Sequence, residues 1–153
     1  MKTGNPTLLI RPATAADIPA MMALEKHAAT AAHWSRKQYE AAFESDVREV
    51  LVLEEGSAVQ GFLVGRRVDD EWEIENVAIA GPARRRGLGT RLVGEFLNRA
   101  RSGGAQSVYL EVRESNLGAR LLYEKWAFVE SGRRKSYYRD PEEDAVLYRL
   151  DFP

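Results

Sequence analysis

Three arginines and two glycines lie together in the sequence "ARRRGLGT", at positions 83–90. The residues that follow have the apolar spacing of a helix. The amino end of a helix presents N–H groups without intrahelical partners and about half a positive charge. Glycines let a ligand approach the backbone closely, and arginine side chains suit phosphate oxygens. The pattern therefore indicates a site for a phosphate-bearing ligand; the alternative is a solvated basic loop with a glycine cap.

Two other nucleotide-binding motifs fit this segment poorly. A P-loop has four residues between its glycines and then Gly-Lys-Ser/Thr, but five residues separate Gly81 from Gly87, and Leu88 stands at the lysine position. A dinucleotide-binding turn needs a third glycine, where this chain has Leu92, although Glu111 follows at about the distance of that motif's acidic residue. The P-loop is excluded, and the dinucleotide fold is disfavoured.

Glu111 is a candidate general base. It lies in the alternating segment "SVYLEVR", on the face opposite the apolar Val108, Leu110 and Val112. If that strand is central in a sheet, desolvation would raise the pKa of this carboxyl into the useful range. Pairing with Arg113 or another surface arginine is the alternative.

Tyr123 is a candidate general acid. It follows Asn116 by seven residues, two helical turns, so both side chains project from one face of a helix. A phenol with a pKa near 10 can protonate a thiolate whose conjugate acid is near 8.5, with water assisting. A core tyrosine with a satisfied hydroxyl is the alternative.

Further polar and aromatic residues are weaker candidates. Glu73 and Glu75 share one face of a strand and could serve as a secondary base, or they could form an ordinary solvent-facing acidic row. Trp34, Tyr137 and Tyr138 could wall a groove for an acceptor peptide, with ordinary packing equally favoured. The two histidines, six residues apart, make neither a metal site nor a catalytic triad.

Composition limits the class of protein. We expect residues 1–153 to form a single domain with a proper core. A net charge of -1 argues against a dedicated nucleic-acid binder, and the absence of cysteine excludes disulfides and thiolate metal sites. No apolar run approaches the roughly 18 residues of a membrane span, and no signal-peptide core is evident, so the cytoplasm is the expected compartment.

The elements that must position these groups follow from periodicity and turn residues. Strands are expected at 7–13, 49–55, 58–68, 71–79, 107–115, 127–135 and 144–152. Helices are expected at 14–28, 34–45, 90–104 and 116–126. Ser35 and Gln38 form a capping box at the second helix, where Trp34 and Tyr39 are placed as a hydrophobic staple. The fold class is therefore a mixed α/β (α+β) domain with six or seven strands and about four helices.

The segment "RRRGLG" at 84–89, after "NVAI" and before an amphipathic helix, resembles the acetyl-CoA motif of the GNAT N-acyltransferases. The later "LEVRESNLGARLLYEKWAF" resembles the second half of that motif set. Matches at "HWS" and near the C-terminus resemble the branch that acetylates the N-terminal alanine of a ribosomal protein. The likeness covers nearly the whole chain and implies the GNAT fold.

The resemblance also implies roles for individual residues. Backbone groups from Val77 to Ile79 would bind the pantetheine arm, Glu111 would be the general base and Tyr123 the general acid. The implied contacts of acetyl-CoA are Val77, Ala78, Ile79, Arg84, Arg85, Arg86, Gly87, Leu88, Gly89, Thr90 and Asn116. No metal is implied. Two positions depart from the family pattern: Ala127 stands where a glycine is usual, and Gly81-Pro82 replaces an acidic-Pro pair.

The expected reaction is direct transfer of the acetyl group of acetyl-CoA to a protein N-terminal amine in a ternary complex. The expected partner is an N-terminal peptide, possibly of a ribosomal protein, with no nucleic acid and no membrane, for a chain that is a monomer or weak dimer. A GNAT enzyme acting on a small-molecule amine or a lysine is one alternative. A non-catalytic CoA-binding sensor or interaction module is another.

Overall fold

The computed structural model describes residues 7–28, 33–84 and 86–153. It contains one seven-stranded sheet in the order β1-β2-β3-β4-β5-β7-β6. The strands are β1 (Leu8–Pro12), β2 (Arg48–Glu55), β3 (Ala58–Val68), β4 (Glu71–Ile79), β5 (Ser107–Arg113), β6 (Val129–Tyr138) and β7 (Glu143–Asp151). The helices are α1 (Ile18–Lys26), α2 (Arg36–Glu44), α3 (Leu88–Ser102) and α4 (Leu117–Lys125), with short 3₁₀ turns at Ala15–Asp17 and Gly81–Ala83. The expected mixed fold is confirmed.

Local signals explain where the helices begin and end. Ser35 caps α2 by accepting from the Gln38 N–H at 3.2 Å, while the Gln38 side chain accepts from the Ser35 N–H at 2.7 Å. The rings of Trp34 and Tyr39 pack 5.5 Å apart as the predicted staple. α3 begins at Leu88, two residues before the predicted start at Thr90.

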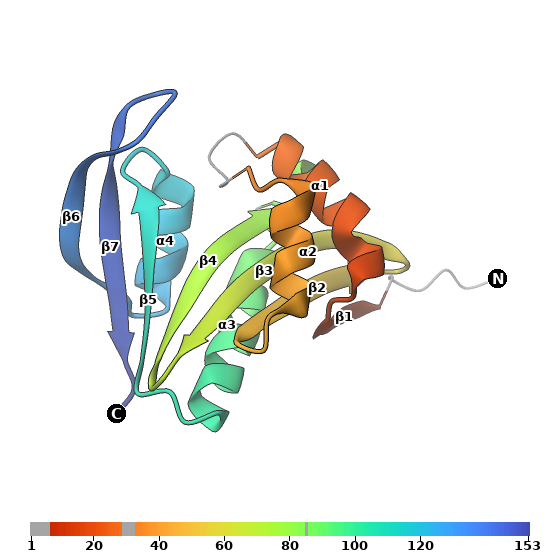
Figure 1. The fold of residues 1–153 in the computed structure, drawn as a ribbon, viewed down its shortest axis with the longest axis horizontal. Helices are drawn as coiled ribbons and strands as arrows, with labels where there is room; N and C mark the ends of the chain where they lie inside the picture. The colour runs from red at the N-terminus through yellow and green to blue at the C-terminus, as the bar shows by residue number, and fades with distance from the viewer. Residues whose placement is uncertain (1–6, 29–32, 85) are drawn as a thin grey trace.

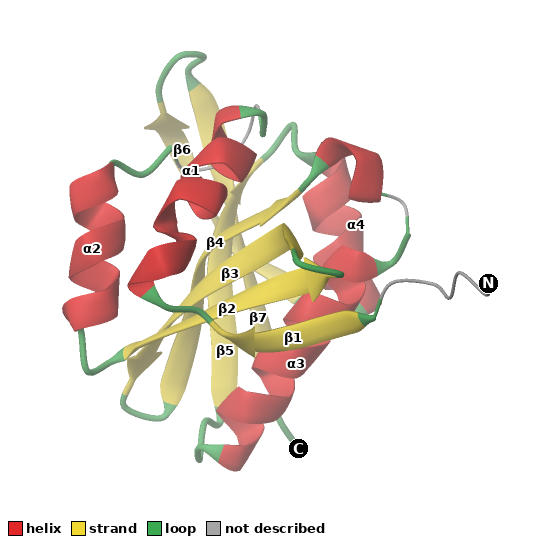
Figure 2. Cartoon of the chain, turned by 90° about the vertical axis from the view of Figure 1, so that its right-hand side faces the viewer, coloured by secondary structure: helices red, strands yellow, loops and turns green. Residues whose placement is uncertain are grey.

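The helices cover the sheet in two pairs, α1 and α2 on one face and α3 and α4 on the other (Figures 1 and 2). The apolar spacing in α3 forms its inner face, since Leu92, Phe96, Leu97 and Ala100 are buried. The α3 cluster includes Trp72 of β4, and a separate apolar cluster lies under α1 and α2. No helix in the described ranges is long and apolar enough to cross a membrane.

β4 contains a bulge at Glu75. Its pairing with β3 shifts register there, from Val64 opposite Asn76 to Gly65 opposite Ile74. A bulge inserts one unpaired residue and reverses which face the following side chains occupy. Ile74 therefore packs into the α3 cluster, while Asn76 contacts α1 and α2 on the other face. The bulge lets one strand present groups to both sides of the sheet.

β4 and β5 are the only parallel neighbours among the paired strands, and they diverge. Their pairing runs only from Glu71–Ile74 opposite Ser107–Leu110. Beyond Ile74 the two strands separate, as Figure 1 shows at the upper ends of β4 and β5. The later part of β4 consequently has a strand neighbour on one side only.

The helix-to-strand connection after α4 explains one departure from the family pattern. Ala127 has φ +70°, in the left-handed region that favours glycine. The Ala127 N–H bonds the Glu124 carbonyl, and the Phe128 N–H bonds the Tyr123 carbonyl, both at 3.0 Å. This is the Schellman pattern, in which the residue at Ala127 is most often glycine. Ala127 thus adopts a left-handed conformation at the position where the resemblance implies a glycine.

Candidate active site

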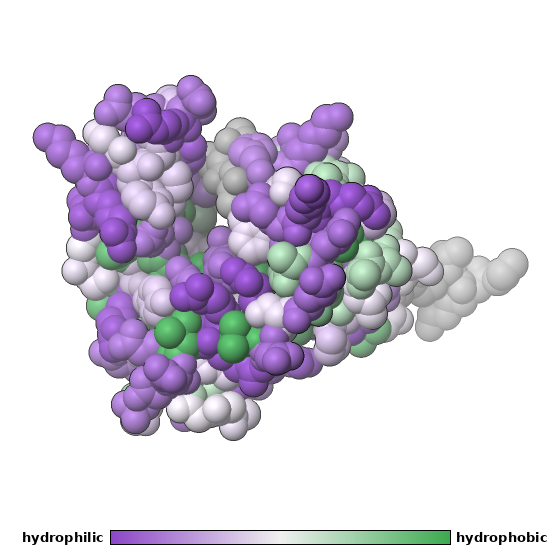
Figure 3. Space-filling view, in the orientation of Figure 1, coloured by the Kyte–Doolittle hydropathy of each residue, from purple (hydrophilic) through white to green (hydrophobic). Residues whose placement is uncertain are grey.

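A cavity of about 760 Å³ lies where β4 and β5 diverge. Figure 3 shows the corresponding hollow between the β5–β7 part of the surface and the part formed by α1 and α2. Most predicted site residues line this cavity: Val77, Ala78, Ile79, Arg84, Gly87, Leu88, Gly89, Thr90, Glu111, Asn116 and Tyr123. The structure therefore gathers groups from β4, β5, α3 and α4 around one space.

The amino end of α3 faces the cavity. Gly87 is the N-cap residue with φ +75°, a conformation that glycine adopts without strain. The first helical bond of this turn runs from the Arg91 N–H to the Gly87 carbonyl at 3.1 Å. The N–H groups of Leu88, Gly89 and Thr90 precede that bond and have no intrahelical acceptor. An anion beside this turn would meet those donors and the positive end of the helix dipole.

The arginines of the turn differ in their placement. Arg84 lines the cavity, and its Nε donates to the Ile79 carbonyl at 3.2 Å. Arg86 turns away to form a two-point ion pair with Glu55, at 2.8 and 2.5 Å, and is not among the cavity residues. Arg85 falls outside the described residues. Of the described arginines of the turn, Arg84 is thus the one beside the cavity.

The unpaired edge of β4 supplies backbone groups. The Ala80 N–H bonds the Gln60 carbonyl of β3 at 2.8 Å. Because backbone groups alternate along a strand, those of Ala78 also turn toward β3, and those of Val77 and Ile79 turn toward the gap. The backbone of Val77 and the N–H of Ile79 are therefore placed to bind an extended ligand, while the Ile79 carbonyl accepts from Arg84. Ala78 lines the same space without a free backbone group.

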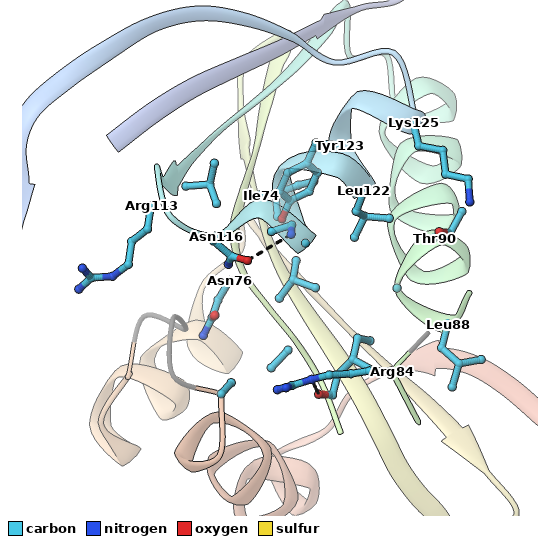
Figure 4. Close-up of a pocket in the computed structure, with 18 of the residues that line it drawn as sticks. Ile74, Asn76, Arg84, Leu88, Thr90, Arg113, Asn116, Leu122, Tyr123 and Lys125 are labelled. Atoms are coloured by element: carbon cyan, nitrogen blue, oxygen red, sulfur yellow. Dashed lines mark hydrogen bonds between the residues drawn. The ribbon is translucent and has the colours of Figure 1, made fainter. Parts of the chain in front are cut away.

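Asn116 and Tyr123 approach the cavity from α4, as predicted for residues on one helical face (Figure 4). The Asn116 Oδ1 caps α4 by accepting from the Ala119 N–H at 3.2 Å. Tyr123 is buried, with 6% of its surface exposed. Burial, and secondarily the neighbouring Tyr138, raise the pKa of the Tyr123 phenol well above its ordinary value. The phenol therefore stays protonated at neutral pH.

Glu111 is only partly desolvated. Its side chain keeps 22% exposure, and its Oε1 accepts from Nε of Arg134 at 2.8 Å. The expected surface-arginine partner is thus Arg134 of β6. The other suggested partner, Arg113, instead bonds the carbonyls of Arg139 and Pro141. Val108, Leu110 and Val112 lie buried on the opposite face, as predicted.

Glu73 and Glu75 lie near Glu111 but in different environments. Glu75 is held by Arg48 through bonds of 2.8 and 3.2 Å. Glu73 has a looser contact with Arg66, at 3.8 Å. Burial, followed by the negative charge of Glu75, raises the pKa of Glu73 above its ordinary value. The expected acidic row is therefore a set of ion pairs, and Glu73 is a carboxyl whose pKa is raised by burial.

The three aromatic candidates differ in their positions relative to the cavity. Tyr138 lines the cavity and stacks under the Arg113 guanidinium, 4.5 Å from its ring centre. Burial and the nearby Glu111 raise the pKa of Tyr138 to about 12. Tyr137 is exposed and lies against Arg134. Trp34 belongs to the cluster under α1 and α2.

Sequence reasoning missed several cavity residues because they have no distinctive local pattern. Asn76, Arg113, Leu122 and Lys125 also line the space. Asn76 donates to the carboxylate of Glu25, which is 3% exposed. The sequence offered one signal of this buried contact: Glu25 lies among the apolar residues on the inner face of its helix.

Comparisons with known proteins agree with this geometry. The family model described as the acetyltransferase (GNAT) family matches residues 18–128. The [ribosomal protein bS18]-alanine N-acetyltransferase of Escherichia coli is 32% identical over 136 residues, covering 88% of this chain and 90% of that protein. The Haemophilus influenzae protein of the same name is 40% identical over 100 residues, 63% of this chain and 68% of its own. The crystal structure of the Escherichia coli ribosomal-protein alanine N-acetyltransferase superimposes with a TM-score of 0.85 at 28% identity, covering 95% of this chain and 94% of that one.

Proposed function

The chain belongs to the acetyltransferase (GNAT) family, and from that premise we propose that it transfers the acetyl group of acetyl-CoA to the N-terminal α-amine of a protein. The N-terminal alanine of a ribosomal protein, the group modified by the relatives named above, is the first acceptor to test. We place this activity in the cytoplasm. The observation that carries the proposal is one cavity holding an anion-binding helix end, a free strand edge, a carboxylate and a buried phenol.

The described residues fit acetyl-CoA. The N–H groups at the start of α3 would bind its diphosphate, with Arg84 beside them. The backbone of Val77 and Ile79 would bind the pantetheine arm as a neighbouring strand binds. Asn116 would contact the coenzyme from α4. When bound, acetyl-CoA supplies the thioester whose acetyl group is transferred.

Glu111 is proposed to take the proton of the acceptor amine. An α-amine has a pKa near 7.7–8.0, against about 10.4 for a lysine side chain, so a modest base suffices. The neutral nitrogen would attack the thioester carbonyl directly, and the C–S bond would break as the amide forms. The incoming amine must share the Glu111 carboxylate with Arg134 or displace it, since that guanidinium lies 2.8 Å away.

Tyr123 is proposed to donate a proton to the departing thiolate. Its phenol lines the cavity and stays protonated at neutral pH, so it can act as the acid. The raised pKa makes the transfer uphill, and this favours a proton passed as the sulfur leaves. Tyr123→Phe tests this role: kcat should fall, while the peptide KM should stay at the wild-type value.

The test is an acetyl-transfer assay with purified protein and a peptide library that varies the first three residues. Lysine peptides with blocked N-termini and small amines serve as alternative acceptors. Turnover should be greatest with a free N-terminal alanine. Preference for a blocked lysine peptide or a small amine would transfer the proposal to that acceptor class. Acetyl-CoA binding without turnover of any acceptor would favour the sensor role.

The base is tested by Glu111→Gln, which should lower kcat roughly 10²–10⁴-fold while leaving the Kd for acetyl-CoA within about two-fold. Glu114→Gln is the matched control, because Glu114 pairs with Arg133 on the surface. Glu73→Gln is made in parallel, since Glu73 is the nearby carboxyl whose pKa is raised. A wild-type rate in Glu111→Gln with a loss in Glu73→Gln would move the base to β4.

A further inference from the structure

Glu25 is a buried carboxylate that the proposed reaction does not use. It lies in the last full turn of α1 with 3% of its surface exposed, inside the apolar cluster under α1 and α2. No arginine or lysine of the described chain forms a salt bridge with it; its hydrogen-bond donors are neutral. Burying a carboxylate is costly unless it is fully hydrogen-bonded. A charge kept at such a position therefore needs a structural or functional reason.

The three donors to Glu25 come from different segments. The Trp34 N–H, just before α2, donates to Oε1 at 2.8 Å. The Tyr39 hydroxyl, from α2 itself, donates to Oε2 at 2.5 Å. The Asn76 side-chain amide, next to the β4 bulge, donates to Oε1 at 3.0 Å. One carboxylate thus joins α1, the start of α2 and the bulge.

The joined segments border the cavity on the α1–α2 side of the sheet. Asn76 lines the cavity, and so does Ala28, three residues after Glu25. Arg48 makes a second link, since it bonds Glu75 of the bulge and lies over the Trp34 ring at 5.9 Å. The proposed coenzyme groups, by contrast, come from α3, α4 and the outer backbone edge of β4. The Glu25 contacts therefore act on the side of the cavity left for the acceptor.

We propose that Glu25 is a positioning residue for the acceptor: by accepting from Trp34, Tyr39 and Asn76, its carboxylate holds α2 and the residue just before it against the β4 bulge. This inference rests on the proposed transfer to an amine. It assigns the buried charge to acceptor binding and leaves acetyl-CoA binding to the other groups. A glutamine there would keep one oxygen for two of these groups and point an N–H₂ group at the third, so one of the three contacts would no longer be a donation to a carboxylate.

The test is Glu25→Gln, compared with the wild type for peptide KM, kcat and the calorimetric Kd for acetyl-CoA. We expect the peptide KM to rise about ten-fold, with the Kd for acetyl-CoA within two-fold of wild type. Tyr39→Phe removes a single donor and should move the peptide KM in the same direction by less. Glu40→Gln is the matched control on α2, because Glu40 is 52% exposed and pairs with Arg36 alone within the described residues.

Native-state hydrogen exchange supplies a readout that does not depend on turnover. The Trp34 amide should exchange faster in Glu25→Gln than in wild type, and amides of β5 should not. A wild-type protein that acetylates no peptide overturns the proposed function, while the exchange data still report on the contacts of Glu25. An unchanged peptide KM in folded Glu25→Gln, or an equal loss of peptide and acetyl-CoA affinity, overturns the positioning role. If Glu25→Gln does not fold, Tyr39→Phe decides by the same criteria.

Discussion

The left-handed backbone at Ala127 makes a quantitative prediction about stability. Ala127 has φ +70° and carries a Cβ into a region where only glycine is unstrained. The left-handed conformation costs a non-glycine residue about 1–2 kcal/mol. Replacing alanine with glycine removes this strain, but it also frees the unfolded chain, which costs about 0.4–1 kcal/mol. The net expectation for Ala127→Gly is a gain of about 0.5–1 kcal/mol in the free energy of unfolding.

Urea denaturation followed by circular dichroism measures this gain, and calorimetry gives a second reading. For a chain of this size, 1 kcal/mol shifts Tm by roughly 2–4 °C, so Tm should rise by about 1–4 °C. The matched control is Ala41→Gly, the same substitution at an exposed position inside α2. There the helix is right-handed, and glycine should lower stability by about 1 kcal/mol.

The two variants are expected to change the free energy of unfolding in opposite directions. This difference separates the effect of the left-handed backbone from a general effect of glycine. If Ala127→Gly lowers stability as Ala41→Gly does, the turn after α4 is not left-handed at Ala127, and the reasoning fails. If both variants are neutral, the strain at Ala127 is relieved elsewhere. The Schellman bonds from Ala127 and Phe128 would then need to be re-examined by hydrogen exchange.

Two further predictions concern side-chain packing and pH. Gly94→Ala should lower stability by about 1–3 kcal/mol, because a Cβ there would lie 2.5 Å from the Trp126 ring; a higher Tm in thermal unfolding, as expected from helix propensity alone, would contradict this. Asp17→Asn should cost about 2 kcal/mol at pH 7, since Asp17 accepts two bonds from Arg11 at 2.8 and 2.9 Å. The bonds to Arg11 hold the pKa of Asp17 below its ordinary value. This stabilisation is therefore fully present when the pH is above the ordinary aspartate pKa, and it is lost as the pH falls through the lower pKa of the folded state. Urea titrations at pH 7 and pH 3 should therefore show the difference between variant and wild type shrink in acid, and a constant difference would refute the assignment.

Features set by neighbouring residues were predictable from the sequence. The capping box of Ser35 and Gln38 depends on contacts three residues apart, and it forms as expected. The alternation in 107–113 correctly placed Glu111 opposite the buried Val108 and Leu110, because strand periodicity is local.

Features set by distant pairing were not predictable. Arg134 of β6 reaches Glu111 of β5 because β7 pairs with both strands, a matter of strand order rather than of local sequence. The bulge at Glu75 leaves the alternation of buried residues along β4 unbroken, so no pattern reveals it. Arg86 bonds Glu55, which lies 31 residues earlier in the chain. This ion pair holds the Arg86 side chain away from the cavity, although the sequence around Arg86 predicts that it lies there.

The divergence of β4 and β5 opens the sheet to both of its faces at one point. Cavity residues come from the α1–α2 side, such as Asn76, and from the α3–α4 side, such as Leu122. Groups on opposite faces of the sheet therefore line one space. Under the proposed function, substitutions on the α1–α2 side would alter the acceptor that is bound, while the acetyl-CoA contacts on the α3–α4 side would be unchanged.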